Sequence, residues 1–157
     1  MKAFYGLLLF VSLALGQQTG KPPFKIAITI EDSTIVAGNN VWINVSLTNT
    51  SDHDVYEGVM YMEGIDLDTT FRFEVRDEHG KLVPKITSPH PELAPGSVRF
   101  RTIRVGETLT QQQRVSGQYD MRQPGKYAIQ VFRGVSQNSK DDIKSNIVTV
   151  TVTDKKR

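Results

Sequence analysis

Apolar and polar residues alternate with a period of two along most of this chain, and this pattern constrains the fold more than any other feature. Helical periodicity is hard to find. Successive side chains of a β-strand point to opposite faces, so the alternation predicts half-buried antiparallel strands. The clearest runs are 24–31 (FKIAITIE), 41–48 (VWINVSLT), 71–76 (FRFEVR), 127–133 (YAIQVFR) and 147–153 (IVTVTVT).

Weaker runs and turn signals complete the predicted strand pattern. Further strands are expected at 55–62, 98–105 and 107–115. Glycine supplies positive φ, and asparagine or aspartate supplies local hydrogen bonds, where the chain reverses. Such clusters stand at AGNN (37–40), NTSDHD (49–54), DEHG (77–80), PELAPGS (91–97) and VSQNSKDD (135–142). The DEHG turn followed by KLVPKI predicts a hairpin, whose second strand is confined to a sheet edge by Pro84.

Seven to nine short strands without intervening helices predict an all-β fold, an immunoglobulin-like antiparallel β-sandwich. A length of 157 residues suits one domain. The chain has no cysteine, which excludes disulfides, thiol catalysis and thiolate metal sites. A core must therefore form without covalent links. The formal net charge is only +2, which argues against nucleic acid as a partner.

The N-terminal segment has the features of a signal peptide. Lys2 is followed by the apolar run LLLFVSLAL (7–15), and Ala14 and Gly16 are small residues at a cleavage-site spacing. The alternative, an uncleaved anchor, is disfavoured because the run is shorter than the roughly 20 residues that span a bilayer. We expect a secreted or periplasmic protein without a transmembrane segment in its mature chain. The expected organisation is a signal peptide at 1–16, a linker at 17–23, the sandwich at 24–153 and a basic tail at 154–157.

The segment YDMRQPGKYAIQVFR (119–133) places Asp120, Lys126 and Tyr127 around a Pro-Gly turn. In immunoglobulin-like sandwiches, a tyrosine near the start of the penultimate strand bonds back to the backbone a few residues upstream, forming a tyrosine corner. A reactive site would need a neighbouring group that activates Tyr127 or Lys126 inside a pocket. The sequence shows no such group, so we interpret the segment as a structural corner.

Four motifs in fixed order carry a resemblance to known families. They are VWINVSLTNTS, FRFEVRDEHGK, VGETL and PGKYAIQV. With them the chain resembles bacterial exported immunoglobulin-like domains of uncharacterised function. It is similar, more distantly, to the bacterial intracellular proteinase inhibitor family, whose chains share a Gly-Glu-Thr strand start followed by Pro-Gly-x-Tyr. The resemblance spans about residues 24–153 and implies a sandwich fold. The loop signatures Asn-Pro-Thr-Thr-Gly and Arg-Pro-Trp of chagasin-like inhibitors are absent.

Other side-chain groups are weak as sites. His53, His79 and His90 are too widely spaced for a zinc motif. His53 with Met60 and Met62 departs from the usual copper spacing. Asp52, Asp54, Asp66 and Asp68 lack a calcium-loop pattern and suit turns. Arg99, Arg101 and Arg104 around Phe100 hint at nucleic acid, but a solvated sheet face explains Arg99 and Arg101 better. We therefore predict no metal, no cofactor and no catalytic residue, and leave the binding residues unknown.

The sequence favours a non-catalytic interaction module. The hydrolase motifs G-x-S-x-G and H-E-x-x-H are absent, so we expect no enzyme. Binding is expected on loops 49–54 and 134–145, which would lie at one end of a sandwich, with a protein or cell-surface component as partner. Two alternatives stay open: a protease inhibitor presenting the proline-rich loop 87–97, and a structural domain of an envelope assembly. Sequons at Asn44 and Asn49 mean glycosylation only in a eukaryotic secretory pathway. The oligomeric state stays open.

Overall fold

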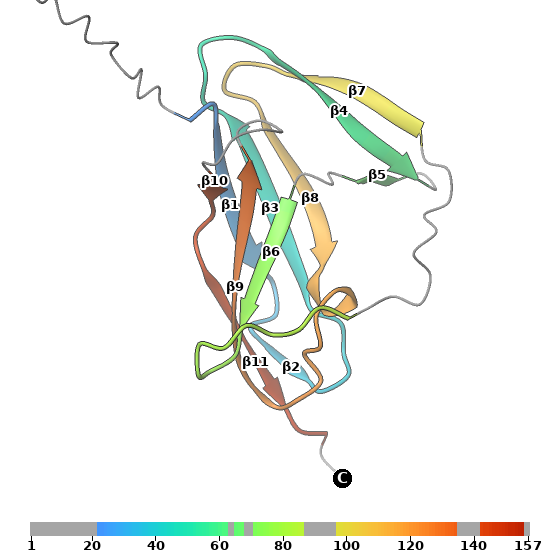
Figure 1. Ribbon diagram of the computed structural model, residues 1–157, viewed down its shortest axis with the longest axis vertical. Helices are drawn as coiled ribbons and strands as arrows, with labels where there is room; N and C mark the ends of the chain where they lie inside the picture. The colour runs from blue at the N-terminus through green and yellow to red at the C-terminus, as the bar shows by residue number, and fades with distance from the viewer. Residues whose placement is uncertain (1–21, 63–64, 68–70, 87–96, 135–141, 156–157) are drawn as a thin grey trace, which may run out of the picture.

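A computed structural model of the protein describes residues 22–62, 65–67, 71–86, 97–134 and 142–155 (Figure 1). Within these ranges the regular structure is eleven strands and a single short 3₁₀ turn. No helix in the described ranges is long and apolar enough to cross a membrane. The predicted signal peptide and most of the predicted linker lie outside these residues. The all-β fold class predicted from the sequence is confirmed.

The strands occur along the chain in the following order. They are β1 (Phe24–Ile30), β2 (Thr34–Val36), β3 (Trp42–Asn49), β4 (Val55–Met62), β5 (Ile65–Leu67), β6 (Phe71–Arg76), β7 (Ser97–Ile103), β8 (Thr108–Arg114), β9 (Gly125–Gly134), β10 (Asp142–Lys144) and β11 (Val148–Thr153), with the 3₁₀ turn at Val115–Gly117 after β8.

Two sheets form the sandwich. Sheet A has the order β1-β3-β8 and is antiparallel throughout. In sheet B, β9 pairs with β6, β10 and β11, and β11 pairs in parallel with β2. Because β6 occupies one side of β9 over the length that meets both β10 and β11, those two strands share the other side. β10 and β11 therefore lie end to end along the same edge of β9, and residues 145–147 separate them.

The alternation seen in the sequence directs the apolar side chains between the two sheets. In sheet A, Ile28, Ile43 and Val45 are buried, and in sheet B so are Ile129 and Val150. Burying such side chains stabilises the fold by about 1.5–3 kcal/mol each. Ile43, Val45 and Ile129 belong to one buried apolar cluster, so packing holds the two sheets together without a covalent link.

The interruption between β10 and β11 joins the two sheets at one edge. The Asn146 side chain accepts a hydrogen bond from Ile28 N and donates one to Ile28 O, both at 2.9 Å. Ser145 N donates to Val131 O, and Val131 N donates to Ser145 Oγ, also at 2.9 Å. β1 is an edge strand of sheet A, and its backbone groups on that edge need hydrogen-bond partners. The Asn146 amide supplies them at Ile28 in place of a further strand.

A third group of strands, β4, β5 and β7, forms an arm that projects from the sandwich (Figure 1). We call it the β4–β7 arm. At its base Ile103 is fully buried, and Val55 packs against the core. Farther along, the Glu57 carboxylate accepts hydrogen bonds from Arg101 at 2.6 and 2.9 Å and also pairs with Arg133 of β9. A shared carboxylate therefore links the arm to sheet B.

The predicted strands are confirmed, with two corrections. The hairpin expected after DEHG is wrong as a strand pair, because 81–86 makes only isolated bridges, Arg76 with Leu82 and Lys85 with Tyr119. Pro84 lacks an N–H and so cannot continue a ladder. The short strands β2, β5 and β10 were not expected, since three residues are too few to show a period.

Candidate functional site

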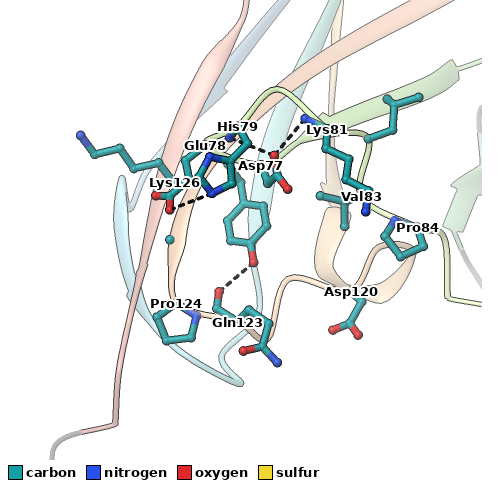
Figure 2. Close-up of a pocket in the computed structure, with 13 residues that line it drawn as sticks. Asp77, Glu78, His79, Lys81, Val83, Pro84, Asp120, Gln123, Pro124 and Lys126 are labelled. Atoms are coloured by element: carbon teal, nitrogen blue, oxygen red, sulfur yellow. Dashed lines mark hydrogen bonds and ion pairs between the residues drawn. The ribbon is translucent and has the colours of Figure 1, made fainter.

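A surface pocket forms where the turn after β6 meets the segment that leads into β9 (Figure 2). Its volume is about 370 Å³. It brings together the three residues that the sequence singled out, Asp120, Lys126 and Tyr127. The turn adds four polar, ionisable side chains, Asp77, Glu78, His79 and Lys81. The sequence showed no second group near Tyr127 because the turn lies about 50 residues earlier in the chain.

Tyr127 points into the fold and is hydrogen-bonded. Its hydroxyl donates to Gln123 O at 2.7 Å, four residues upstream, which is the bond predicted for a tyrosine corner. Burial raises the pKa of this hydroxyl above its ordinary value of 10.0, and three carboxylates raise the pKa further: Asp120, Asp77 and Glu78. The phenol is therefore protonated near neutral pH and engaged with the backbone, so it is poorly suited to act as a base.

Two of the three carboxylates of the pocket, Asp77 and Asp120, hold its two turns. Asp77 Oδ1 accepts hydrogen bonds from His79 N at 3.0 Å and Lys81 N at 2.9 Å, as aspartate does in a local turn. Asp120 pairs with Arg122 through both oxygens at 2.8 Å, and this hydrogen bonding lowers the Asp120 pKa. Both carboxylates are occupied by the chain itself, so the pocket geometry supports a structural corner.

Tyr119 is a second structural tyrosine, which the sequence analysis did not single out. Its ring is buried, and its hydroxyl donates to Phe73 O in the middle of β6. Burial raises its pKa. It stands just before the corner and fastens the 3₁₀ turn to sheet B. Tyr119 lies outside the alternating strand segments, so the sequence pattern did not mark it as buried. Its role follows only from its hydrogen bond to Phe73 O, which is remote in sequence.

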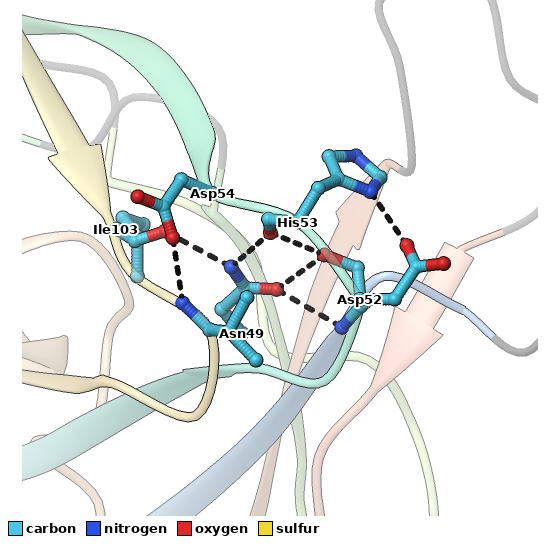
Figure 3. A network of polar contacts seen from close by, with 7 residues as sticks. Asn49, Asp52, His53, Asp54 and Ile103 are labelled. Carbon is cyan, nitrogen blue, oxygen red and sulfur yellow. Dashed lines mark hydrogen bonds and ion pairs between the residues drawn. The ribbon is translucent and has the colours of Figure 1, made fainter.

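The loop at 49–54, expected to carry binding, is organised around one buried side chain (Figure 3). Asn49 is 1% exposed. Its Nδ2 donates to His53 O and Ile103 O at 2.9 Å, and its Oδ1 accepts from Ser51 N at 3.0 Å and Ser51 Oγ at 2.6 Å. Asp54 Oδ1 accepts from Val105 N at 3.0 Å beside it. The loop thus holds the base of the β4–β7 arm.

The same network bears on the two sequons. Both amide protons of Asn49 are donated to carbonyls, and a glycan on Nδ2 would replace one of them in a buried site. Asn44 lies on the solvent side of β3, with one long contact of 3.4 Å to Glu31 Oε1. Of the two asparagines, only Asn44 is compatible with a glycan in the folded state.

The flanks of the two expected binding loops meet at one end of the sandwich. Asn49 at the end of β3 pairs with Phe24 at the start of β1. Arg133, near the end of β9, lies with its guanidinium carbon 4.8 Å from the centre of the Phe24 ring. Most of the second loop, 135–141, lies outside the described residues. The proline-rich segment 87–96 also lies outside them.

Some of the residues that the sequence analysis weighed as metal ligands lie within the described part of the chain. His53 Nδ1 contacts Asp52 Oδ1 at 2.8 Å, and this hydrogen bond lowers the Asp52 pKa. His79 Nε2 lies 3.7 Å from Glu78 Oε1. His90 and Asp68 lie outside the described residues. In the part of the chain that the structure describes, no three histidine or carboxylate side chains are arranged to hold a metal ion.

The β4–β7 arm carries an exposed aromatic pair that sequence reasoning missed. Tyr56 and Phe100 are 69% and 61% exposed, and their rings stack with centroids 5.3 Å apart and planes inclined by 8°. The arm also corrects the expectation that Arg101 lines a solvated face, because Arg101 points the other way and binds Glu57. The alternation in 98–105 predicted the strand that carries Phe100. The sequence did not show that this strand pairs with 55–62, which carries Tyr56.

No protein-family model matches the chain, and no curated protein matches it. Among solved structures it is similar to a β-glucosidase from Erythrobacter marinus, with 14% identity, a TM-score of 0.43 and coverage of 83% of this chain and 15% of that one. It is also similar to a β-glucosidase from Listeria innocua in complex with glucose, with 15% identity, a TM-score of 0.41 and coverage of 82% and 16%. The chain thus spans about one sixth of the length of the structures it matches.

The expectation that the protein is not an enzyme is corrected by these matches. Both are described as β-glucosidases, so the absence of enzymatic activity is not retained as a conclusion. The likeness, at these TM-scores, also carries no activity over to this chain.

Proposed function

We propose that the protein is an exported, immunoglobulin-like binding module that recognises a partner protein through the outer face of the β4–β7 arm. The stacked pair Tyr56–Phe100 carries this proposal. Large aromatic side chains are normally buried, and those left exposed together are typical of interaction surfaces. Tyrosine is also enriched among the residues that dominate binding energy at protein interfaces. Export rests on the N-terminal sequence.

The attachment of the arm supports the proposal. Glu57 joins Arg101 of the arm to Arg133 of sheet B, and Asn49 and Asp54 fasten its base. These contacts hold the aromatic pair in place before a partner arrives. Less conformational entropy is then lost on binding, which favours affinity. Loop 49–54 contributes here by positioning the arm.

A photo-crosslinking experiment tests the proposal. A benzophenone amino acid replaces Phe100 in the protein produced in its native host, and a matched control replaces Ile147, which is 60% exposed. We expect a discrete crosslinked partner from position 100 and none from 147. In the Phe100 probe protein, Tyr56→Ala should reduce the yield at least fivefold. Equal adducts from both positions, or none from position 100, would contradict the proposal.

A further inference from the structure

The solvent side of sheet A is a polar surface without charge at its centre. Thr29, Asn44 and Gln112 stand side by side across its three strands. Ser46 and Thr110 form the next row and share a hydrogen bond of 3.0 Å. All five side chains are fully or partly exposed. These hydroxyls and amides can both donate and accept hydrogen bonds.

The surface ends in an exposed indole. Trp42 is 42% exposed and is paired across the sheet with Arg114, whose guanidinium carbon lies 6.0 Å from the ring centre. At the opposite end, Thr48 and Thr108 share a hydrogen bond of 2.8 Å. From Trp42 to Thr48 the surface extends roughly 20 Å, taking about 3.3 Å per residue.

Sheet B shows that this composition is not general to the chain. Its solvent side carries Arg72, Glu74 and Arg76 on β6 and Lys126 on β9. Its outward aromatic ring, Phe132, is covered by cations, with Arg72 at 5.0 Å and Lys144 at 5.6 Å. The two faces of one sandwich therefore differ. Sheet B carries charged side chains along β6, whereas the centre of sheet A is uncharged and its charged neighbours are Lys25, Arg114 beside Trp42 and Glu31 at 3.4 Å from Asn44.

We infer that the solvent side of sheet A is a second binding site, for a neutral oligosaccharide. Sugar hydroxyls match the amides and hydroxyls of Asn44, Gln112 and Thr29, and the apolar face of a sugar ring suits the Trp42 indole. An anionic polymer would find cations only at the margins, Lys25 and Arg114. A protein partner would require a more apolar centre than these side chains provide. This inference is independent of the function proposed for the arm.

Affinity electrophoresis tests the inference. The purified protein, produced without N-glycosylation so that Asn44 is free, is run through gels that contain hydroxyethylcellulose, galactomannan, arabinoxylan, mixed-linkage β-glucan or, as the anionic comparison, alginate. We expect at least one neutral polymer to retard it. Trp42→Ala and Gln112→Ala should each weaken that affinity about tenfold or more, while Trp42→Phe retains most of it.

Two controls separate the possible outcomes. Phe100→Ala, which removes the aromatic pair of the arm, should leave the retardation unchanged, so this inference and the proposed function can fail separately. Urea denaturation confirms that the Trp42 and Gln112 variants are folded under the conditions of the gel, as expected for residues outside the buried core. The inference is overturned if no neutral polymer retards the protein, if alginate alone does, or if a folded Trp42→Ala variant binds as tightly as the parent.

Discussion

Replacing Asn49 with alanine tests the polar network at the base of the arm. The substitution removes four hydrogen bonds: two donated to His53 O and Ile103 O, and two accepted from Ser51. Ile103 is fully buried, so its carbonyl cannot turn to water. An unsatisfied buried group costs about 1–3 kcal/mol.

The other partners contribute less to the expected loss. Ser51 and His53 are partly or fully exposed, so water can replace their lost bonds and the cost there is about 0.5–1 kcal/mol together. The total expected loss in the free energy of unfolding is therefore about 1.5–4 kcal/mol. Urea denaturation followed by far-ultraviolet circular dichroism measures it, provided that the transition is two-state.

Asn44→Ala is the matched control, because it makes the same chemical change on the same strand. Asn44 faces solvent and has one weak contact of 3.4 Å, so we expect a change within about 0.5 kcal/mol. If the two variants lose equal stability, the buried network does not hold the arm, and the reasoning from hydrogen-bond satisfaction is wrong.

Two further predictions concern the Glu57 carboxylate, which pairs with Arg101 and Arg133, and the corner at Tyr127. Glu57→Ala should destabilise the protein by about 3–5 kcal/mol, because it removes the carboxylate of a buried ion pair, whereas Glu74→Ala, which breaks a surface pair with Arg76, should cost at most about 1 kcal/mol in the same urea assay. Tyr127→Phe should cost about 1 kcal/mol. The pKa of the Tyr127 hydroxyl is raised in the folded state. Its contribution to the free energy of unfolding is therefore complete below about pH 10 and is lost as the pH rises through the folded pKa. Above about pH 10 the urea midpoint should fall less steeply with pH in Tyr127→Phe than in the parent protein, and equal slopes would refute this role of the hydroxyl.

Much of the sandwich was predictable because the burial of one face of a β-strand produces a pattern within the strand's own sequence. A half-buried strand alternates its side chains, so the inward residues of β1, β3, β9 and β11 could be read directly. The corner at Tyr127 was also predictable, since its acceptor, Gln123 O, lies only four residues away. Contacts between residues so close in the sequence can be recognised from a single short segment.

The site residues were harder to predict because their partners are remote. Glu57 meets Arg101 44 residues later and Arg133 76 residues later, and nothing near any one of them specifies the others. Asn49 has the local appearance of a loop residue or a sequon. Its burial follows from a contact with Ile103, 54 residues away.

The sequence by itself therefore determined the strand content, the inward faces and the corner, because these depend on periodicity and short-range hydrogen bonds. Only the tertiary structure decided that 55–62 pairs with the strand before Arg104 to form an arm, and that Tyr56 and Phe100 meet on its outer face. It also decided that Trp42 stands beside a neutral polar surface. Strand pairing depends on which edges remain available once the two sheets have packed, and that is a property of the whole chain.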